Sequence, residues 1–163
     1  MDKIAVQALI DYNRNRVPVS KDFMLREFEC RGIQKGMTCC GGLAGVDPIN
    51  LNALQKTRDY INKPLSPSSG FRCVEYNKCV GGKPASRHLV SLAVDLPCAG
   101  TGLTPDELAD ILLKFGVVRV AIYTELKFVH MEGYDRYTDS GVRYDRRFYV
   151  PKQEKEEEGG SGE

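Results

Sequence analysis

The sequence predicts an α+β domain in which a small antiparallel sheet is flanked by helices. Two segments carry strong helix start signals, and two short apolar segments later in the chain are typical of strands joined by a tight polar turn. Helices and strands come in groups rather than in regular alternation, which favours α+β over a parallel α/β fold. The chain has 163 residues, the length of one domain, and we expect residues 1–150 to form it.

Helices are predicted in three segments. Apolar residues in 4–12 recur at helical spacing. Segment 47–61 opens with an Asp-Pro pair, which is typical of an N-cap followed by proline at the first helical position. Segment 104–116 opens with Thr-Pro-Asp-Glu, a capping box, and closes on a glycine that ends the helix.

Strands are predicted in four segments. The apolar run 89–96 reads as a buried strand, and 117–123 and 127–131 read as a hairpin with Thr124-Glu125 in its turn. Segment 143–150 alternates well enough for a late edge strand. These strands supply the small antiparallel sheet of the predicted fold.

Charge and composition argue against two classes of partner, nucleic acids and membranes. The chain has 23 Lys and Arg against 22 Asp and Glu, which argues against a nucleic-acid binder. No run of 18 apolar residues exists, so we expect no membrane insertion.

The first residues lack a signal peptide's apolar core, so synthesis in a cytoplasm is expected. The acidic tail 151–163 is expected to be disordered, and the protein to be a monomer.

The only two histidines and one unusual carboxylate lie in or beside apolar segments. Asp95 stands inside the predicted strand 89–96, where a carboxylate is costly unless it is paired. His88 lies seven residues earlier, and His130 lies in the second hairpin strand. Two imidazoles and a carboxylate suffice for a catalytic zinc ion with one position left for water. Spacing alone does not establish that His88 meets His130, so ordinary core histidines remain an alternative.

The residues around this trio resemble a known family. Ser86-x-His88-x6-Asp95 resembles the S-x-H-x-x-G-x-A-x-D signature of the M15 zinc peptidases, which act as D-Ala-D-Ala carboxypeptidases and endopeptidases and share a fold with the hedgehog signalling domain. Segment 69–72, Ser-Gly-Phe-Arg, resembles the family's S-G-[FY]-R motif, and 128–132 its F-V-H-[IV]-D strand. The similarity covers about residues 17–134 and is greatest to small single-domain versions from bacteriophages and bacteria.

The resemblance implies a function and a set of site residues. His88, Asp95 and His130 match the zinc ligands, and Arg72 matches the arginine that binds the substrate. Ser86 would orient the first ligand or touch the substrate. The implied activity is hydrolysis of amide bonds in peptidoglycan peptides at the bacterial cell wall, by a D-Ala-type carboxypeptidase or endopeptidase, with a phage lysis enzyme as one setting.

The acid that moves protons during catalysis is left open between two residues. Lys127 stands where some family members have an acid, so we consider Glu132, on the same strand face as His130, and Glu125, near the hairpin turn, as equal candidates. Ser91 stands where the motif has glycine. These two departures favour an alternative function, a domain of the same fold that binds zinc and a cell-wall or protein partner without cutting it. A metal-free structural protein is a third possibility.

The six cysteines are interpreted mainly as free or buried thiols. Cys30, Cys39 and Cys40 precede a glycine pair and are candidates for a structural zinc site, but the sequence has no C-x-x-C spacing. A disulfide between Cys73 and Cys79 and a cysteine nucleophile are further alternatives with less support.

Overall fold

The computed structural model describes residues 15–133 and 146–151. The predicted helix at 4–12 and the tail beyond Pro151 lie outside the described residues. The elements are η1 (Leu25–Phe28), η2 (Ile33–Lys35), α2 (Pro48–Ile61), α3 (Val74–Cys79), η3 (Arg87–Val90), β1 (Ala93–Pro97), α4 (Pro105–Lys114), β2 (Arg119–Tyr123), β3 (Phe128–Glu132) and β4 (Arg147–Tyr149), where η denotes a 3-10 helix.

The strands form one four-stranded sheet in the order β1-β3-β2-β4. β2 and β3 form the predicted hairpin, and β1 pairs with β3 antiparallel on its other edge. The prediction of a wholly antiparallel sheet is wrong for β4, which runs parallel to β2. β3 already pairs with β1 and β2, so β4 can add only to an outer edge of the sheet. β4 runs opposite to β3, as β2 does, and therefore lies parallel to β2.

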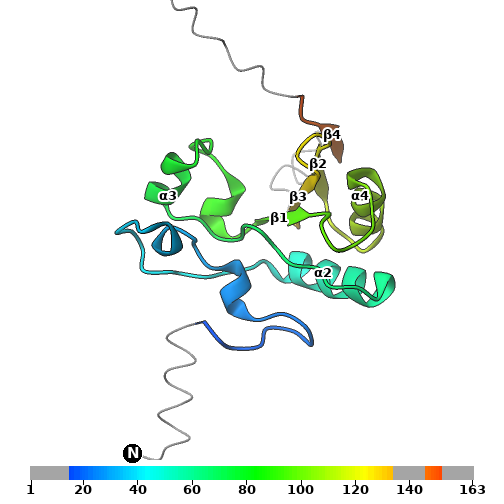
Figure 1. The fold of residues 1–163 in the computed structure, drawn as a ribbon, viewed down its shortest axis with the longest axis horizontal. Coiled ribbons are helices and arrows are strands. Elements are labelled where there is room, and N and C mark those ends of the chain that lie inside the picture. Colours follow the sequence, from blue (N-terminus) through cyan, green and yellow to red (C-terminus); the bar gives the residue numbers. More distant parts are fainter. Residues whose placement is uncertain (1–14, 134–145, 152–163) are drawn as a thin grey trace, which may run out of the picture.

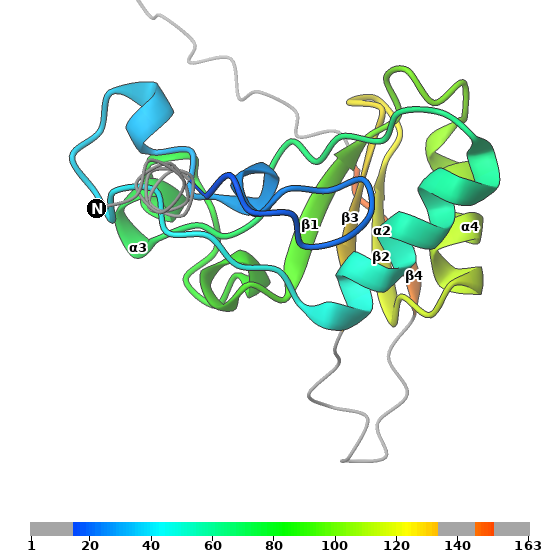
Figure 2. The ribbon, with the colours of Figure 1, turned by 90° about the horizontal axis from the view of Figure 1, so that it is seen from below.

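Side-chain alternation gives the sheet two chemically different faces. Val94 and Leu96 of β1 and Val129 and Met131 of β3 are fully buried in the main core. The residues between them, Asp95 and His130, point to the other face. Figure 2 shows α2 and α4 beside the sheet, and buried residues of both helices belong to the same core. The helices therefore cover the apolar face, and the opposite face carries the chemistry.

Both long helices start where the sequence predicts. The Asp47 carboxylate accepts hydrogen bonds from the backbone N–H groups of Ile49 and Asn50 at 2.9 and 3.1 Å. Thr104 and Glu107 form the reciprocal capping box of α4. Past the end of α4, Gly116 adopts a φ of 100°, which favours glycine. Among the helices of the described segments, none combines the length and apolar character that a membrane span requires.

A second, smaller lobe lies beside the sheet on the side away from α2 and α4 (Figure 1). It consists of residues 29–45 and 70–82, and we call it the cysteine lobe. Its regular elements are η2 and the six-residue α3. Its own buried cluster contains Cys30, Cys73 and Tyr76 and is separate from the main core.

Candidate metal centre

The structure brings His88, Asp95 and His130 together from three different elements. Asp95 on β1 and His130 on β3 are direct cross-strand partners, so the register of the sheet places their side chains side by side. His88 comes from η3, which precedes β1. One ligand atom from each of the three residues lies within 4.8 Å of the other two. The rings of His88 and His130 are 5.0 Å apart between centroids.

His88 lies on a 3-10 helix, which corrects the prediction of a strand over 89–96. Only Ala93–Pro97 is extended, because the chain first turns through η3 and then reverses at Ser91 in the left-handed region, with a φ of 61°. Ser86 caps η3, and its hydroxyl accepts a hydrogen bond from the backbone N–H of His88 at 3.4 Å. In the structure, Ser86 therefore positions the backbone that carries His88.

The His88 ring presents a buried lone pair to the centre of the trio. Its Nδ1 lies 2.6 Å from the carbonyl oxygen of Gly70, which requires a proton on Nδ1. In the neutral ring, Nε2 then carries no proton. Nε2 is buried without a hydrogen bond, and Asp95 Oδ1 lies 3.2 Å away. Two acceptors that face each other at this distance repel unless a cation or a proton lies between them.

His130 lies between two carboxylates. Its Nδ1 is 2.8 Å from Asp95 Oδ1, and its Nε2 is 3.1 Å from Glu132 Oε1. Burial acts to lower the pKa of His130, but the two carboxylates outweigh it and raise that pKa to about 9. Glu132 thus binds the ring nitrogen that faces away from Asp95. That contact leaves Nδ1 directed at the centre of the trio.

The two histidines keep Asp95 ionised, and Arg72 pairs with its second oxygen. Burial acts to raise the pKa of Asp95, but His130 and His88 lower it well below its usual range. The guanidinium of Arg72 contacts Asp95 Oδ2 at 2.5 Å and donates to Ser69 Oγ at 2.8 Å. Oδ1 therefore faces the histidines while Oδ2 faces Arg72. Burial also opposes ionisation of Glu132, but His130 and Arg119 hold its pKa below the ordinary value.

An open cleft of about 370 Å³ adjoins the trio at Asp95 and Arg72. Its walls come from segment 68–72, from α3, and from the ends of β1 and β3. The lining residues are Ser68, Ser69, Arg72, Tyr76, Val80, Asp95, Pro97, Leu126 and Phe128. A substrate lying in this cleft would meet the guanidinium of Arg72 beside the trio.

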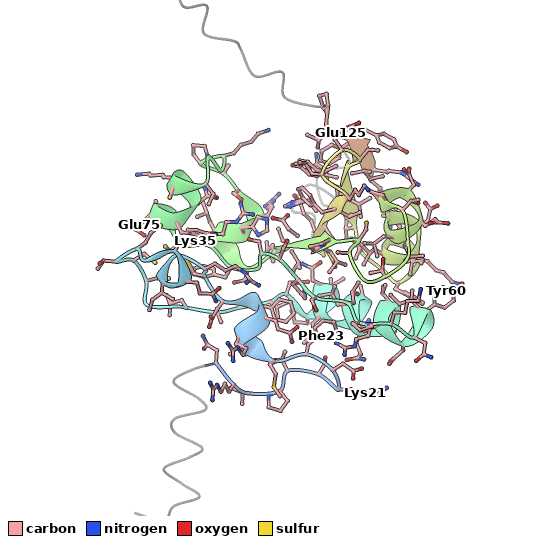
Figure 3. The ribbon with its side chains drawn as sticks, in the orientation of Figure 1. Lys21, Phe23, Lys35, Tyr60, Glu75 and Glu125 are labelled. Carbon is pink, nitrogen blue, oxygen red and sulfur yellow. The ribbon has the colours of Figure 1, made fainter. Side chains whose placement is uncertain are left out.

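The two candidate acids occupy different places. Glu132 is buried and contacts His130, as described above. Glu125 is exposed at the end of the β2–β3 hairpin (Figure 3), next to the cleft residue Leu126. Among the described residues, no hydrogen bond or ion pair joins Glu125 to the trio. Lys127 adopts a φ of 52° in the hairpin turn.

The donor set and its geometry fit a divalent zinc ion. Two imidazole nitrogens and one carboxylate oxygen are ligands that zinc binds in catalytic sites with an open fourth position. His88 Nε2 lies buried without a hydrogen bond, and Asp95 Oδ1 faces a nitrogen of each histidine. Gly70 and Glu132 hold the remaining ring nitrogens in the orientation that a metal-binding histidine needs.

Four sulfur atoms form a second group that the sequence showed only in part. Cys30, Cys39 and Cys40 meet Cys73, the N-cap of α3, and the four sulfurs lie within 4.8 Å of one another. Burial raises the pKa of Cys30 to about 12. Burial acts on Cys40 as well, but amide groups of Leu43 and Gly42 outweigh it and lower the pKa of that thiol. All six cysteines are unbridged.

Comparison with known proteins identifies the family. No curated protein matches the chain. The family model described as Peptidase M15 matches residues 21–132, which include segment 69–72, all three residues of the trio and Glu132. The match covers more than half of the 163 residues and includes the whole candidate metal centre. The chain belongs to the Peptidase M15 family.

Proposed function

We propose that this protein is a zinc peptidase that hydrolyses amide bonds in peptidoglycan peptides, as a D-Ala-type carboxypeptidase or endopeptidase. The observation that carries the proposal is the convergence of His88, Asp95 and His130 beside a cleft, in a chain of the Peptidase M15 family. Each of the three residues has a second contact that fixes its orientation. Such outer contacts are typical of metal centres that act in catalysis.

The chain's own residues supply the binding and positioning functions. A zinc ion held by the trio would polarise a carbonyl and activate water at its open position. His88 and His130 would offer Nε2 and Nδ1 as ligand atoms, and Asp95 would offer Oδ1. Arg72 faces both Asp95 and the cleft, and its planar guanidinium suits the carboxylate or carbonyl of a peptide end. An arginine at this place supports a substrate with a free carboxylate, such as a terminal D-alanine.

The positions of the two acids suggest different tasks. Glu132 binds the ring nitrogen of His130 that faces away from Asp95, which supports a positioning role. Glu125 lies exposed beside cleft residue Leu126, which supports a role for its carboxylate in transferring a proton from water to the leaving amine. In Glu125→Gln we expect lower kcat with full zinc content. In Glu132→Gln we expect lower zinc affinity.

Purified full-length protein incubated with muropeptides and zinc tests the proposal. New peptide products detected by mass spectrometry, lost in His88→Ala and after chelation and regained on adding zinc, are the expected result. Loss of a single terminal alanine would indicate a carboxypeptidase, whereas two peptide fragments would indicate an endopeptidase.

Two outcomes would overturn the proposed activity. Unchanged muropeptides with zinc bound at the trio would support the binding domain of the same fold. Unchanged muropeptides without zinc at the trio would support a metal-free protein. A lower zinc content in His88→Ala than in wild type would show that the trio binds zinc, whether or not the protein cleaves muropeptides.

A further inference from the structure

The four cysteines of the cysteine lobe converge on one point. Cys30 follows η1, Cys39 and Cys40 lie in the loop after η2, and Cys73 caps α3. Figure 3 shows sulfur atoms gathered between η2 and α3, in the region of the labelled Lys35 and Glu75. Because the cysteines come from three separate stretches of chain, local sequence does not explain their meeting.

The distances match a tetrahedral metal site better than a disulfide. A zinc ion with Zn–S bonds of about 2.3 Å holds its sulfurs about 3.8 Å apart. The sulfurs of Cys30 and Cys73 are 3.7 Å apart, and all four lie within 4.8 Å of one another. A disulfide would bring a pair of sulfurs to about 2.05 Å, much closer than the 3.7 Å between Cys30 and Cys73.

Backbone N–H groups near the sulfurs act to favour their ionised form. Such contacts favour thiolates, which are the form that binds metals, over neutral thiols in an apolar cluster. The amide of Tyr76 donates to the Cys73 sulfur at 3.4 Å. Burial acts to raise the pKa of the other three thiols, but neighbouring amides act to lower it: those of Gly32 and Cys73 on Cys30, of Gly41 on Cys39, and of Gly42 and Leu43 on Cys40.

The glycines of this lobe make room for the sulfurs. A Cβ on Gly32 would lie 2.5 Å from the Cys39 sulfur, so only glycine lets that sulfur approach. Gly41 and Gly42 have φ values of 71° and 84°, which turn the chain directly after Cys40. The backbone is therefore shaped around the four sulfurs.

Among the described residues, few apolar side chains are buried in the cysteine lobe. Its buried cluster holds only Cys30, Cys73 and Tyr76, with a few half-buried neighbours. η2 has three residues and α3 has six, too short to be stable without packing partners. Small units of this kind are commonly stabilised by a metal ion or by disulfides.

We propose that Cys30, Cys39, Cys40 and Cys73 bind a structural zinc ion as a four-thiolate site, separate from the trio. On binding, the ion displaces the thiol protons, which pass to solvent. The four ligands leave no position for water, so this site has no hydrolytic role. Its ion would join the loop 30–45 to α3 and fix Cys73, the residue directly after Arg72. Arg72 in turn contacts Asp95, so the site would stabilise the part of the cleft wall that contains Arg72.

Metal content of full-length protein purified under reducing conditions tests the site. We expect about two zinc ions per chain in wild type and about one in Cys30→Ser/Cys73→Ser. His88→Ala/His130→Ala is expected to retain about one, held by the cysteines. Cys79→Ser, which changes an exposed cysteine outside the group, is the matched control and is expected to keep the wild-type content.

Cobalt substitution keeps the test independent of whether the double cysteine variant folds. Cobalt bound to wild type and to His88→Ala/His130→Ala is expected to give the intense thiolate-to-metal charge-transfer absorption of a four-sulfur site. Absence of that absorption would overturn the proposal. So would alkylation and mass analysis showing any two of the four cysteines joined by a disulfide. A wild type with one zinc that is lost only with the cysteines would uphold this site and refute the zinc of the proposed function.

Discussion

Replacing Glu132 by glutamine is expected to weaken the pH dependence of stability in the metal-free protein. His130 lies between Asp95 and Glu132, and both carboxylates favour its charged form. Glutamine keeps the size of the side chain and one acceptor oxygen but removes the charge. The substitution therefore separates the electrostatic contribution of Glu132 from its packing.

The size of the effect follows from the shift in the His130 pKa. In the folded protein this pKa is about 9, against an ordinary value of 6.5. A difference of about 2.5 units corresponds to roughly 3 kcal/mol of folding free energy as an upper limit. Because the folded pKa is raised, this stabilisation is full below about pH 6.5 and is lost as the pH rises through 9. In Glu132→Gln the loss between these pH values should be smaller.

Urea unfolding of both proteins with a chelator, at several pH values from 6 to 9.5, measures this difference. The two proteins share every other ionisable group, so the difference between the two pH profiles isolates His130 and its contact with Glu132. Identical profiles, or a wild type whose stability rises towards pH 9.5 relative to the variant, would refute the assigned geometry. With zinc bound at the trio, the proton on Nδ1 is displaced and the His130 contribution to the profile should disappear.

Three further predictions concern the core, a turn and the cleft. Leu96→Ala should destabilise the protein by about 2–5 kcal/mol in urea unfolding, because its side chain is fully buried in the main core; a loss below 1 kcal/mol would contradict that packing. Gly45→Ala should be destabilising because its Cβ would lie 2.4 Å from the Ser91 hydroxyl, and adding Ser91→Gly should restore stability by about 1–3 kcal/mol; additive effects in the double variant would refute the contact. Arg72→Lys should lower kcat/KM on muropeptides roughly 10–100-fold at unchanged zinc content, since lysine cannot reproduce the fork to Asp95 and Ser69; unchanged kcat/KM would exclude Arg72 from the cleft chemistry.

Elements whose formation depends on residues close together in the chain could be predicted from the sequence. Asp47 and Thr104 satisfy backbone N–H groups within three residues of themselves, so their helices are visible in a short window. The hairpin of β2 and β3 is equally local. The direction of β4 depends on which sheet edges are already paired, and no local pattern records that. The sequence predicts a start of β1 that is too early, because the apolar run 89–92 reads like a strand although its first residues turn through η3.

The two groups of candidate ligands differ in the same way. His88, Asp95 and His130 stand out because histidine is scarce and the motif around them has a recognisable spacing. Cys73 lies 33 positions after Cys40 without a C-x-x-C pair, so only folding reveals that it joins the other three cysteines. Scarce histidines within a recognisable motif mark ligands even when these lie on different elements, whereas cysteines without such a motif are identified only by the fold.

The direct pairing of Asp95 with His130 across β1 and β3 bears on how the protein responds to chelators. Two of the three candidate ligands are held by backbone hydrogen bonds of a sheet with its own core, so that pocket should survive metal extraction and accept an ion again at once. The loop bearing Cys39 and Cys40 belongs to no strand of the described sheet, and we expect it to lose its structure when its metal is removed. Withdrawing metal should thus produce two separable events, a reversible loss of turnover and a slower loss of structure.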